Sequence, residues 1–215
     1  MKLKEIEMLL QNVQGFDSPK ITLEQYETGP HIGARMLFTM NSFDDIQEKN
    51  ILDLGIGCGR LGIGCAFLGA SFVLGVDIDQ DALTQCSSNC VRLSEEEEIN
   101  CLTNVDLICA DIRENLLWSK FDKVFQVVVM NPPFGTKNNK GIDMIFLKRA
   151  IDCATDSVYS LHKSSTRDHI LRKAKDWGMK PNILAKLRYD LPMTYKFHKK
   201  SSKDIEVDFY RFEKI

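Results

Sequence analysis

Four short runs of apolar residues in the first two thirds of the chain constrain its fold more than any other feature. They occupy residues 51–55, 71–79, 104–112 and 123–131, and segments with helical character separate them. The runs lack the alternation of polar and apolar residues seen in a half-exposed sheet, which indicates strands buried on both faces. Buried strands that alternate with helices predict an α/β fold, in which a doubly wound, mostly parallel sheet is covered on both sides.

Further helices and strands are predicted on either side of these runs. Residues 2–14 and a segment that starts near Pro30 and ends near Phe43 are expected to be helical. The last third should contain helices at 142–154 and 165–177 and strands at 158–163, 182–190 and 204–213. We therefore expect a single domain over 1–215, with a helical extension over 1–46 and a Rossmann-like core over 47–215.

The composition indicates a compact protein that works inside the cell. The chain has 215 residues, 44% of them apolar, which is enough for a sizeable core. Its seven cysteines form no C-x-x-C pair, so we expect reduced thiols and an intracellular location. No metal site is expected, because His31, His162 and His169 lack metal-ligand spacing. We also expect no export signal and no membrane-spanning segment.

A glycine-rich turn, DLGIGCGRLGIG, follows the first apolar run and leads into a helix. Gly55, Gly57 and Gly59 let the backbone approach a ligand at the helix N-terminus. However, Gly57, Gly59 and Gly62 also match the dinucleotide pattern G-x-G-x-x-G, and Asp77 lies about twenty residues further on, as that pattern requires. The spacing alone leaves a dinucleotide and S-adenosylmethionine as competing ligands.

Acidic residues at successive strand ends favour S-adenosylmethionine. Asp53 lies where a pyrophosphate would meet its negative charge, whereas a sulfonium and an α-amino group would be attracted to it. Asp77 is placed to accept hydrogen bonds from ribose hydroxyls, and Asp111 to accept one from the adenine amine. We interpret Asp79 and Asp81 as helix caps.

The segment MNPPFG ends the fourth apolar run, because its two prolines cannot continue a central strand. The side-chain carbonyl of Asn131 and the backbone carbonyl of Pro132 are available to accept both N–H bonds of an exocyclic adenine amine. Pro133 stiffens the turn, and Phe134 offers a ring on which the base can stack. The alternative is a tight Asn-Pro turn with a buried phenylalanine.

The combination D-x-G-x-G-x-G and N-P-P-F resembles the class I S-adenosylmethionine-dependent methyltransferases that act on planar amino groups. LEQYET, NPPFGTKNNKG, YSLHKSSTRDH and LRYDLPMTYKFHKK extend the likeness over nearly the whole chain, and together they resemble the eukaryotic methyltransferase-like protein five family. This resemblance implies a seven-stranded sheet with an antiparallel last strand. It also implies methylation of N6 of one adenosine in small-subunit (18S) ribosomal RNA, a location in the nucleus (nucleolus) and cytoplasm, and a heterodimer with a small zinc-binding activator subunit.

The resemblance also assigns residues to the two ligands. Catalysis is assigned to Asn131, Pro132, Pro133 and Phe134. The expected cofactor-binding residues are Gln25, Tyr26, Thr28, Asp53, Gly55, Gly57, Cys58, Gly59, Asp77, Ile78, Asp111 and Asn131. Glu27 departs from the family pattern, which has proline between Tyr26 and Thr28.

The basic C-terminal part suits an RNA substrate. The net charge of the chain is −2, but Asn131 to Ile215 contains 18 Lys and Arg against 10 Asp and Glu. Basic side chains bind phosphates and aromatic rings stack on unpaired bases. The expected RNA-contacting residues are Lys137, Lys140, Lys163, Arg167, Lys196, Phe197, Lys199 and Lys200.

The third apolar run should be an edge strand in the strand order of this family. An apolar edge invites pairing with a strand from another chain, so we expect the activator to bind along 104–110. Val105, Leu107 and Cys109 are the candidate contacts. A helix of the same chain that covers them is the alternative.

Other functions share parts of this pattern. N-P-P-[YF] motifs also occur in enzymes that methylate protein glutamine side chains at N5 and in guanine N2 methyltransferases. A non-catalytic RNA-binding subunit that keeps the methyltransferase fold and a nicotinamide-binding module are further alternatives. The basic C-terminal part favours RNA, and the longer matched segments favour adenosine.

Overall fold

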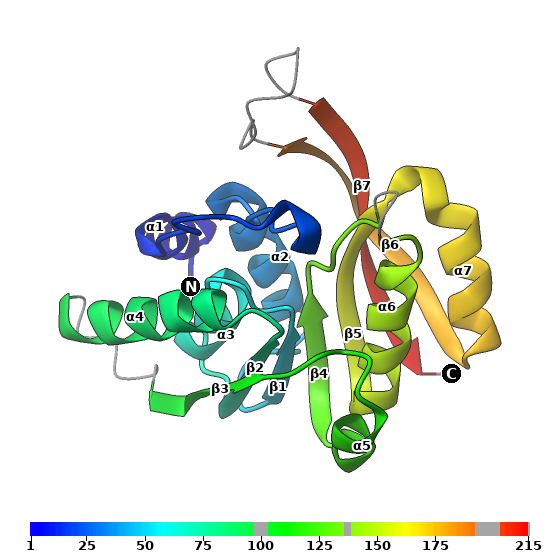
Figure 1. Ribbon diagram of the computed structural model, residues 1–215, viewed down its shortest axis with the longest axis horizontal. Coiled ribbons are helices and arrows are strands. Elements are labelled where there is room, and N and C mark those ends of the chain that lie inside the picture. The colour runs from blue at the N-terminus through cyan, green and yellow to red at the C-terminus, as the bar shows by residue number, and fades with distance from the viewer. Residues whose placement is uncertain (97–102, 136–138, 192–202, 215) are drawn as a thin grey trace.

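The computed structural model describes residues 1–96, 103–135, 139–191 and 203–214. The chain forms a seven-stranded sheet in the order β3-β2-β1-β4-β5-β7-β6 (Figure 1). Strands β1 to β5 pair in parallel, and β7 is antiparallel to both β5 and β6. The strands are β1 Asn50–Leu54, β2 Phe72–Asp77, β3 Val105–Cys109, β4 Phe125–Met130, β5 Ala154–Lys163, β6 Met179–Leu191 and β7 Lys203–Lys214. The predicted fold class is confirmed, including the antiparallel last strand and the edge position of β3.

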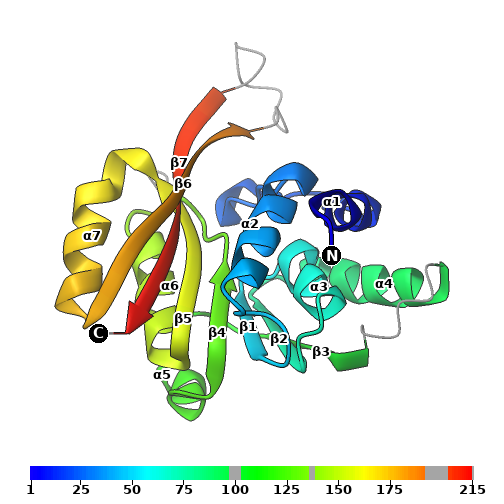
Figure 2. The ribbon, with the colours of Figure 1, turned by 180° about the vertical axis from the view of Figure 1, so that it is seen from behind.

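Helices cover both faces of this sheet (Figures 1 and 2). The α-helices are α1 Leu3–Asn12, α2 Pro30–Ser42, α3 Arg60–Phe67, α4 Gln80–Glu96, α5 Asn115–Trp118, α6 Ile142–Cys153 and α7 Arg167–Asp176. Short 3₁₀ turns lie at η1 Ile21–Leu23, η3 Ser119–Phe121 and η4 Ser164–Thr166. No helix in the described part of the chain combines the length and the apolar character needed to cross a membrane.

Two hydrophobic clusters separate the helices by sheet face. Strand residues alternate between them: Ile51 packs with α1 to α4, whereas its neighbour Leu52 packs with α5 to α7. Such alternation follows from the two-residue period of a strand. The first two helices share the cluster of α3 and α4, so the N-terminal extension packs directly onto the sheet.

The last two strands are longer than predicted. The sequence indicated a strand over 182–190, but β6 begins at Met179 and includes Pro181. Because β6 is an edge strand, Pro181 sits where a missing N–H costs no ladder bond in the interior of the sheet. The sequence prediction began too late because the first residues of β6 include a proline, which is not typical of a strand.

Strand order reverses direction between β1 and β4. β2 and β3 extend to one side of β1, and β4 and β5 extend to the other side. The carboxyl ends of β1 and β4 flank this switch point, which is where open α/β sheets bind ligands. Asp53 near the end of β1 and Asn131 directly after β4 are therefore brought to one crevice.

The described cysteines behave as single thiols. Cys58, Cys65, Cys86 and Cys153 are buried, Cys90 is partly buried and Cys109 is exposed, and all six are free. Cys101 lies outside the described residues.

Candidate active site

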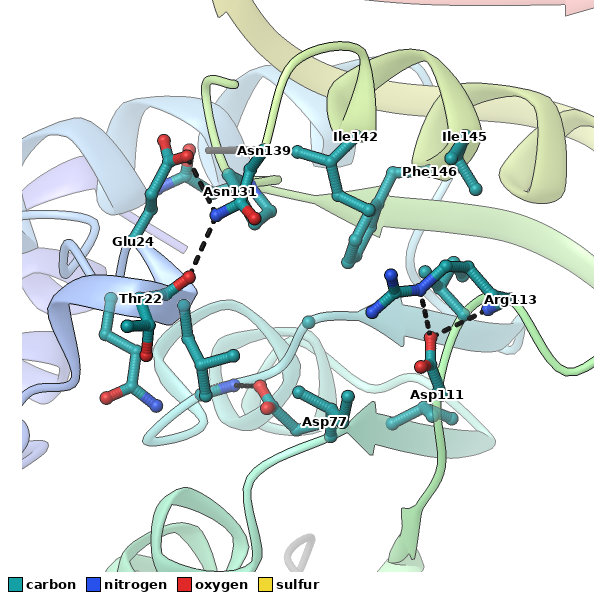
Figure 3. A pocket seen from close by; sticks show the side chains of 18 of the residues that line it. Thr22, Glu24, Asp77, Asp111, Arg113, Asn131, Asn139, Ile142, Ile145 and Phe146 are labelled. Carbon is teal, nitrogen blue, oxygen red and sulfur yellow. Dashed lines mark hydrogen bonds and ion pairs between the residues drawn. The ribbon is translucent and has the colours of Figure 1, made fainter. Parts of the chain in front are cut away.

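A cavity of about 280 Å³ lies at the carboxyl ends of the parallel strands. The N-terminal segment, the strand ends and α6 form its walls (Figure 3). Glu24 and Asn131 lie at one end of it, and Asp111 and Arg113 lie at the other. A smaller cavity of about 50 Å³ adjoins it, and Asn131 lines both.

The glycine loop needs its glycines for two different reasons. Gly55, Gly57 and Gly59 have φ values of +74°, +55° and +95°, a region that side chains disfavour. Gly62 and Gly64 instead allow close packing, since a Cβ atom would lie 2.9 Å from Ile56 Cδ1 and 2.3 Å from Leu37 Cδ1 respectively. Gly55 and Gly57 thus present bare backbone to the cavities, whereas Gly59 lines neither.

Asp53 is a carboxyl group held in an apolar setting. Its side chain lines the smaller cavity and is only 2% exposed. Burial raises the pKa of Asp53 to about 7; the Gly62 N–H opposes this rise and the charge of Asp77 adds to it. A cation in the smaller cavity would therefore stabilise the ionised form of this group.

The other two acids line the larger cavity but are already hydrogen-bonded. Asp77 accepts the N–H of Gly57 and of Asp79, each at 2.9 Å, and burial raises its pKa. Asp111 accepts the backbone N–H and the Nε–H of Arg113 at 2.9 and 3.0 Å. Burial acts to raise the pKa of Asp111, yet these bonds outweigh it and the pKa is lowered. Each carboxylate retains lone pairs for further donors.

Of the two predicted caps, Asp79 acts as one, whereas Asp81 lies in the first turn of α4 and accepts from Lys20 at 2.7 Å. Asp79 accepts the N–H of Asp81 at 3.2 Å at the start of α4, as expected of a capping side chain. Asp79 in addition accepts the Nζ–H of Lys20 at 2.5 Å and the Nε2–H of Gln25 at 2.6 Å. These contacts hold the N-terminal segment against the end of β2.

Asn131 lines both cavities, and hydrogen bonds from its amide nitrogen hold its side chain. Its Nδ2 donates to Thr28 Oγ1 at 2.9 Å and to Tyr189 Oη at 3.0 Å. Its Oδ1 is buried and has no hydrogen-bond partner in the described part of the chain. A buried acceptor without a donor costs free energy unless a ligand supplies one. Oδ1 is thus an unsatisfied acceptor on a residue that lines both cavities.

The segment around Gln25 closes the cavities on one side. Gln25 and Tyr26 line the larger cavity, and Tyr26 and Thr28 line the smaller one. Glu27 accepts from Arg60 at 3.0 Å and from the N–H of Phe16 at 2.9 Å. The departure from the family pattern at Glu27 therefore has a structural role in this chain.

Cys58 and Ile78 complete the expected cofactor residues. Cys58 is buried, lines the smaller cavity, and its carbonyl accepts from Asn89 Nδ2 at 2.9 Å. Ile78 lines the larger cavity and is 43% exposed. With the carboxylates of Asp53, Asp77 and Asp111 as acceptors, these residues fit a ligand with a cationic end, a ribose and an adenine.

Phe134 does not lie where the sequence placed it. Of the N-P-P-F motif, Asn131 and Pro133 line the larger cavity, whereas Pro132 is buried. Phe134 is only 7% exposed and lines neither cavity. Its ring packs edge-on against Tyr189, with centroids 5.6 Å apart and planes at 85°. The conformation with a buried phenylalanine is thus the one observed, and it offers a base little surface for stacking.

Two of the expected RNA-contacting residues can be placed near the strand ends. Lys140 lines the larger cavity, and Lys163 ends β5 partly buried. The expected RNA contact of Arg167 is not supported, because its Nε and Nη2 both donate to the buried Asp208 at 2.7 Å. Lys137, Lys196, Phe197, Lys199 and Lys200 lie outside the described residues.

Sequence reasoning missed Tyr189, Lys20 and Asn139. Asn139 Nδ2 donates to the Thr22 carbonyl at 2.9 Å and to Glu24 at 3.1 Å, which joins the loop after N-P-P-F to the N-terminal segment (Figure 3). All three residues act through partners more than 50 positions away in sequence. No local pattern could have revealed them.

Comparisons with known proteins agree with this geometry. The sequence model of the ribosomal protein L11 methyltransferase (PrmA) family matches residues 26–134, which include the glycine loop and N-P-P-F. The rRNA N(6)-adenosine-methyltransferase METTL5 of Danio rerio is 56% identical over 213 residues, 99% of each chain. Its counterpart from Drosophila melanogaster is 49% identical over 214 residues, covering 99% of this chain and 97% of that one.

The architecture is shared as well. The crystal structure of PH1948 from Pyrococcus horikoshii superposes with a TM-score of 0.82 at 31% identity, covering 99% of this chain and 98% of that one. Both the matched sequences and this structure span the helical extension, the cavities and the final strands. The chain therefore belongs to the METTL5 family of rRNA N6-adenosine methyltransferases.

Proposed function

We propose that this chain transfers a methyl group to N6 of an adenosine in small-subunit (18S) ribosomal RNA. The observation that carries the proposal is the buried Asn131 Oδ1, an acceptor without a partner among the described residues, in the wall of both cavities. An amine N–H on a planar base satisfies this oxygen. The names of the relatives point to adenosine in ribosomal RNA as the source of that amine.

S-adenosylmethionine is the cofactor, and when bound it supplies an electrophilic methyl group on a sulfonium. We assign its charged end to the smaller cavity, which Tyr26 and Thr28 also line and where Asp53 would compensate the positive charge; Gln25 lines the adjoining larger cavity. Asp77 and Ile78 are assigned to the ribose, and Asp111 to the adenine amine. Gly55 and Gly57 line both cavities and Cys58 lines the smaller one, whereas Gly59, also assigned to the cofactor, lines neither.

Asn131 acts on the amine of the substrate adenine. The lone pair of that nitrogen is delocalised into the ring, so acceptance of its N–H bonds by Asn131 Oδ1 and the Pro132 carbonyl favours a more nucleophilic, pyramidal nitrogen. Pro133 restricts the turn and holds these acceptors in place. No general base is needed before transfer, since the amine proton becomes acidic only after methylation. Stacking of the base on Phe134 remains a prediction and requires the ring to move from its contact with Tyr189.

The edge strand β3 supports the proposed partner, a small zinc-binding activator subunit. Val105 and Leu107 are partly buried and Cys109 is exposed on a strand whose outer ladder groups have no neighbouring strand in the described sheet. A strand added along 104–110 would satisfy these groups. We expect the chain alone to be poorly soluble, and equal solubility and activity without the activator would contradict this part of the proposal. A ribosomal RNA substrate also supports residence in the nucleolus and cytoplasm.

The test uses the protein with and without the activator, labelled cofactor and unmodified ribosomal RNA, followed by mass spectrometry of the nucleosides. N6-methyladenosine is the expected product. Asn131→Ala should abolish it while the cofactor still binds, and Asn182→Ala should not, because the Asn182 side chain bonds Glu213 from β6 to β7 and lines neither cavity. A normal rate for Asn131→Ala would refute the assignment of Asn131. Appearance of N2-methylguanosine instead would identify guanine N2 as the target.

A further inference from the structure

Tyr189 of β6 contacts the N-P-P-F motif at two points. Its hydroxyl oxygen accepts from Asn131 Nδ2 at 3.0 Å, and its ring packs edge-on against Phe134. The side chain is 1% exposed, so no solvent competes for these contacts. Tyr189 therefore touches the residue to which catalysis is assigned without lining either cavity.

The hydroxyl proton of Tyr189 is already committed. It is donated to the backbone carbonyl of Glu27 at 2.5 Å, and a carbonyl can only accept. Burial raises the pKa of Tyr189 to about 12, opposed by hydrogen bonds from Asn131 and Thr28, so the phenol keeps this proton at neutral pH. Towards Asn131, the hydroxyl can then act only as an acceptor.

Because the Tyr189 hydroxyl can only accept from Asn131, the two orientations of the Asn131 amide are not equivalent. Thr28 Oγ1, the second partner of Nδ2, gives its own hydrogen bond to Tyr189, so it too accepts from Nδ2 and disfavours the rotated amide. If the amide were rotated by half a turn, Oδ1 would face the lone pairs of Tyr189 and NH₂ would face the cavity. An NH₂ group there would repel the N–H bonds of an adenine amine.

We propose that Tyr189 is a positioning residue that fixes the Asn131 amide with Oδ1 towards the target base. This inference rests on the proposed function and deepens it. Because the proton of Tyr189 is held by Glu27, within the segment that also contains Thr28, the orientation depends on residues 26–28 being in place against β6. The wall of the cofactor cavity and the acceptor for the substrate are thus parts of one hydrogen-bonded unit.

The test compares Tyr189→Phe with wild type in complex with the activator. The variant keeps the ring against Phe134 and loses only the hydroxyl. We expect kcat at saturating cofactor and RNA to fall by about tenfold to a hundredfold, as expected when a reacting group loses its alignment. The dissociation constant for S-adenosylmethionine should change by no more than about twofold, which separates alignment from binding.

Two further variants separate positioning from stability. Tyr159→Phe removes another fully buried hydroxyl, one that bonds Asp45 and lines neither cavity, and it should leave kcat unchanged. Thr28→Val should reduce kcat as well, because Thr28 accepts from the same Nδ2 and bonds Tyr189. Equal losses in Tyr189→Phe and Tyr159→Phe, or wild-type kcat in Tyr189→Phe, would overturn the proposal.

A second readout does not depend on turnover. In protein labelled with ¹⁵N-asparagine, the Nδ2 signals of Asn131, assigned by their loss in Asn131→Ala, should exchange slowly with solvent in wild type and faster in Tyr189→Phe. Unchanged exchange would refute the role of Tyr189 even if kcat falls. Conversely, slow exchange in wild type that is lost in the variant, combined with no methylation of ribosomal RNA, would refute the proposed function and retain the orientation.

Discussion

Lys20 and Asp79 form an ion pair of 2.5 Å that joins the N-terminal segment to the loop after β2. Asp79 is nearly buried, whereas Lys20 is more exposed and also contacts Asp81 at 2.7 Å. Burial acts to raise the pKa of Asp79, but the hydrogen bonds from Lys20 and Gln25 lower it. The pair therefore holds Gln25 and its neighbours beside the cofactor cavity.

Loss of Lys20 should weaken cofactor binding more than it weakens the fold. In Lys20→Ala, Asp79 keeps the bond from Gln25, so we expect the melting temperature to change little. The dissociation constant for S-adenosylmethionine should rise several-fold, mostly through faster dissociation, which stopped-flow fluorescence can measure. Lys148→Ala removes an i,i+4 ion pair with Asp152 on α6 and serves as the control. If the two variants bind S-adenosylmethionine with equal affinity, the ion pair between Lys20 and Asp79 is not needed to hold the segment around Gln25.

The buried Asp53 should make cofactor affinity depend on pH. Its pKa in the free protein is about 7, and a cationic ligand binds best to the ionised form. Affinity for S-adenosylmethionine should therefore rise by up to about tenfold per pH unit below 7 and level off above it. Asp53→Asn should remove this slope, whereas Asp111→Asn should keep it, since the pKa of Asp111 is lowered and that group stays ionised. Calorimetric titration between about pH 5.5 and 7.5 avoids the titration of the ligand's own amino group.

Asp53 should also make the stability of the free protein depend on pH, but in the opposite direction: stability should fall as pH rises. A raised pKa means that the folded state binds a proton more tightly than the unfolded state. This contribution to the free energy of unfolding is full below the unfolded value near 3.8 and is lost as pH rises through about 7. Without ligand, the melting temperature of the wild type should therefore fall relative to that of Asp53→Asn as pH increases. A difference that stays constant with pH would mean that Asp53 is already ionised in the free protein.

The sequence predicted the parts of the site that depend on strand ends. Asp53, Asp77, Asp111 and Asn131 each follow an apolar run, and parallel strands bring their carboxyl ends to one edge of the sheet. The edge position of β3 was likewise predicted, through the strand order of the resembled family. Local runs and their order thus suffice for the architecture and for the acids that line the cavities.

The sequence could not predict contacts made across the antiparallel strands. Tyr189 reaches Asn131 because β6 pairs with β7, and Asp208 of β7 lies opposite His162 of β5, within reach of Arg167. These pairings are set by register over long separations and leave no periodic signal. For the same reason Arg167 looked like a free surface cation, and Phe134 looked available for stacking, until their partners were known.

Arg167 should matter for stability instead of RNA binding. Asp208 is fully buried, and its bonds to Arg167, Ser164 and Tyr210 lower its pKa although burial acts to raise it. A lowered pKa contributes stability above the unfolded value that is lost as pH falls through the lowered one. Arg167→Ala leaves this carboxylate without its cation, so we expect a melting temperature several degrees lower at neutral pH and a smaller deficit in acid.

The matched control for this change is Arg172→Ala on the same helix. Arg172 is paired only weakly, with His169 at 3.2 Å on the exposed face of α7. Its removal should leave the melting temperature unchanged. Both variants should bind ribosomal RNA with similar affinity in a filter-binding assay. A specific loss of RNA affinity in Arg167→Ala, at wild-type stability, would restore the predicted RNA contact.

Gly59 should tolerate a methyl group least among the glycines of the cofactor loop. Its φ is +95°, and a Cβ atom there would lie 2.5 Å from Cys86 Sγ and 2.8 Å from Ile63 Cδ1. The backbone strain alone costs about 1–2 kcal/mol, and the clash must displace α3 or α4. Gly59→Ala is therefore expected to lower the melting temperature and to weaken cofactor binding at least several-fold. Gly29→Ala, where the added methyl meets nothing within 4 Å, should change neither property.

The clash and the strain can be separated with a second substitution. Cys86→Ala removes the nearest atom, so in the Gly59→Ala background it should cost less stability than it costs in wild type. The unfavourable φ remains, so the double variant should stay below Cys86→Ala in thermal melts. Strictly additive effects on the free energy of unfolding would show that Gly59 is required for its backbone conformation alone and that Cys86 does not limit the space beneath the loop.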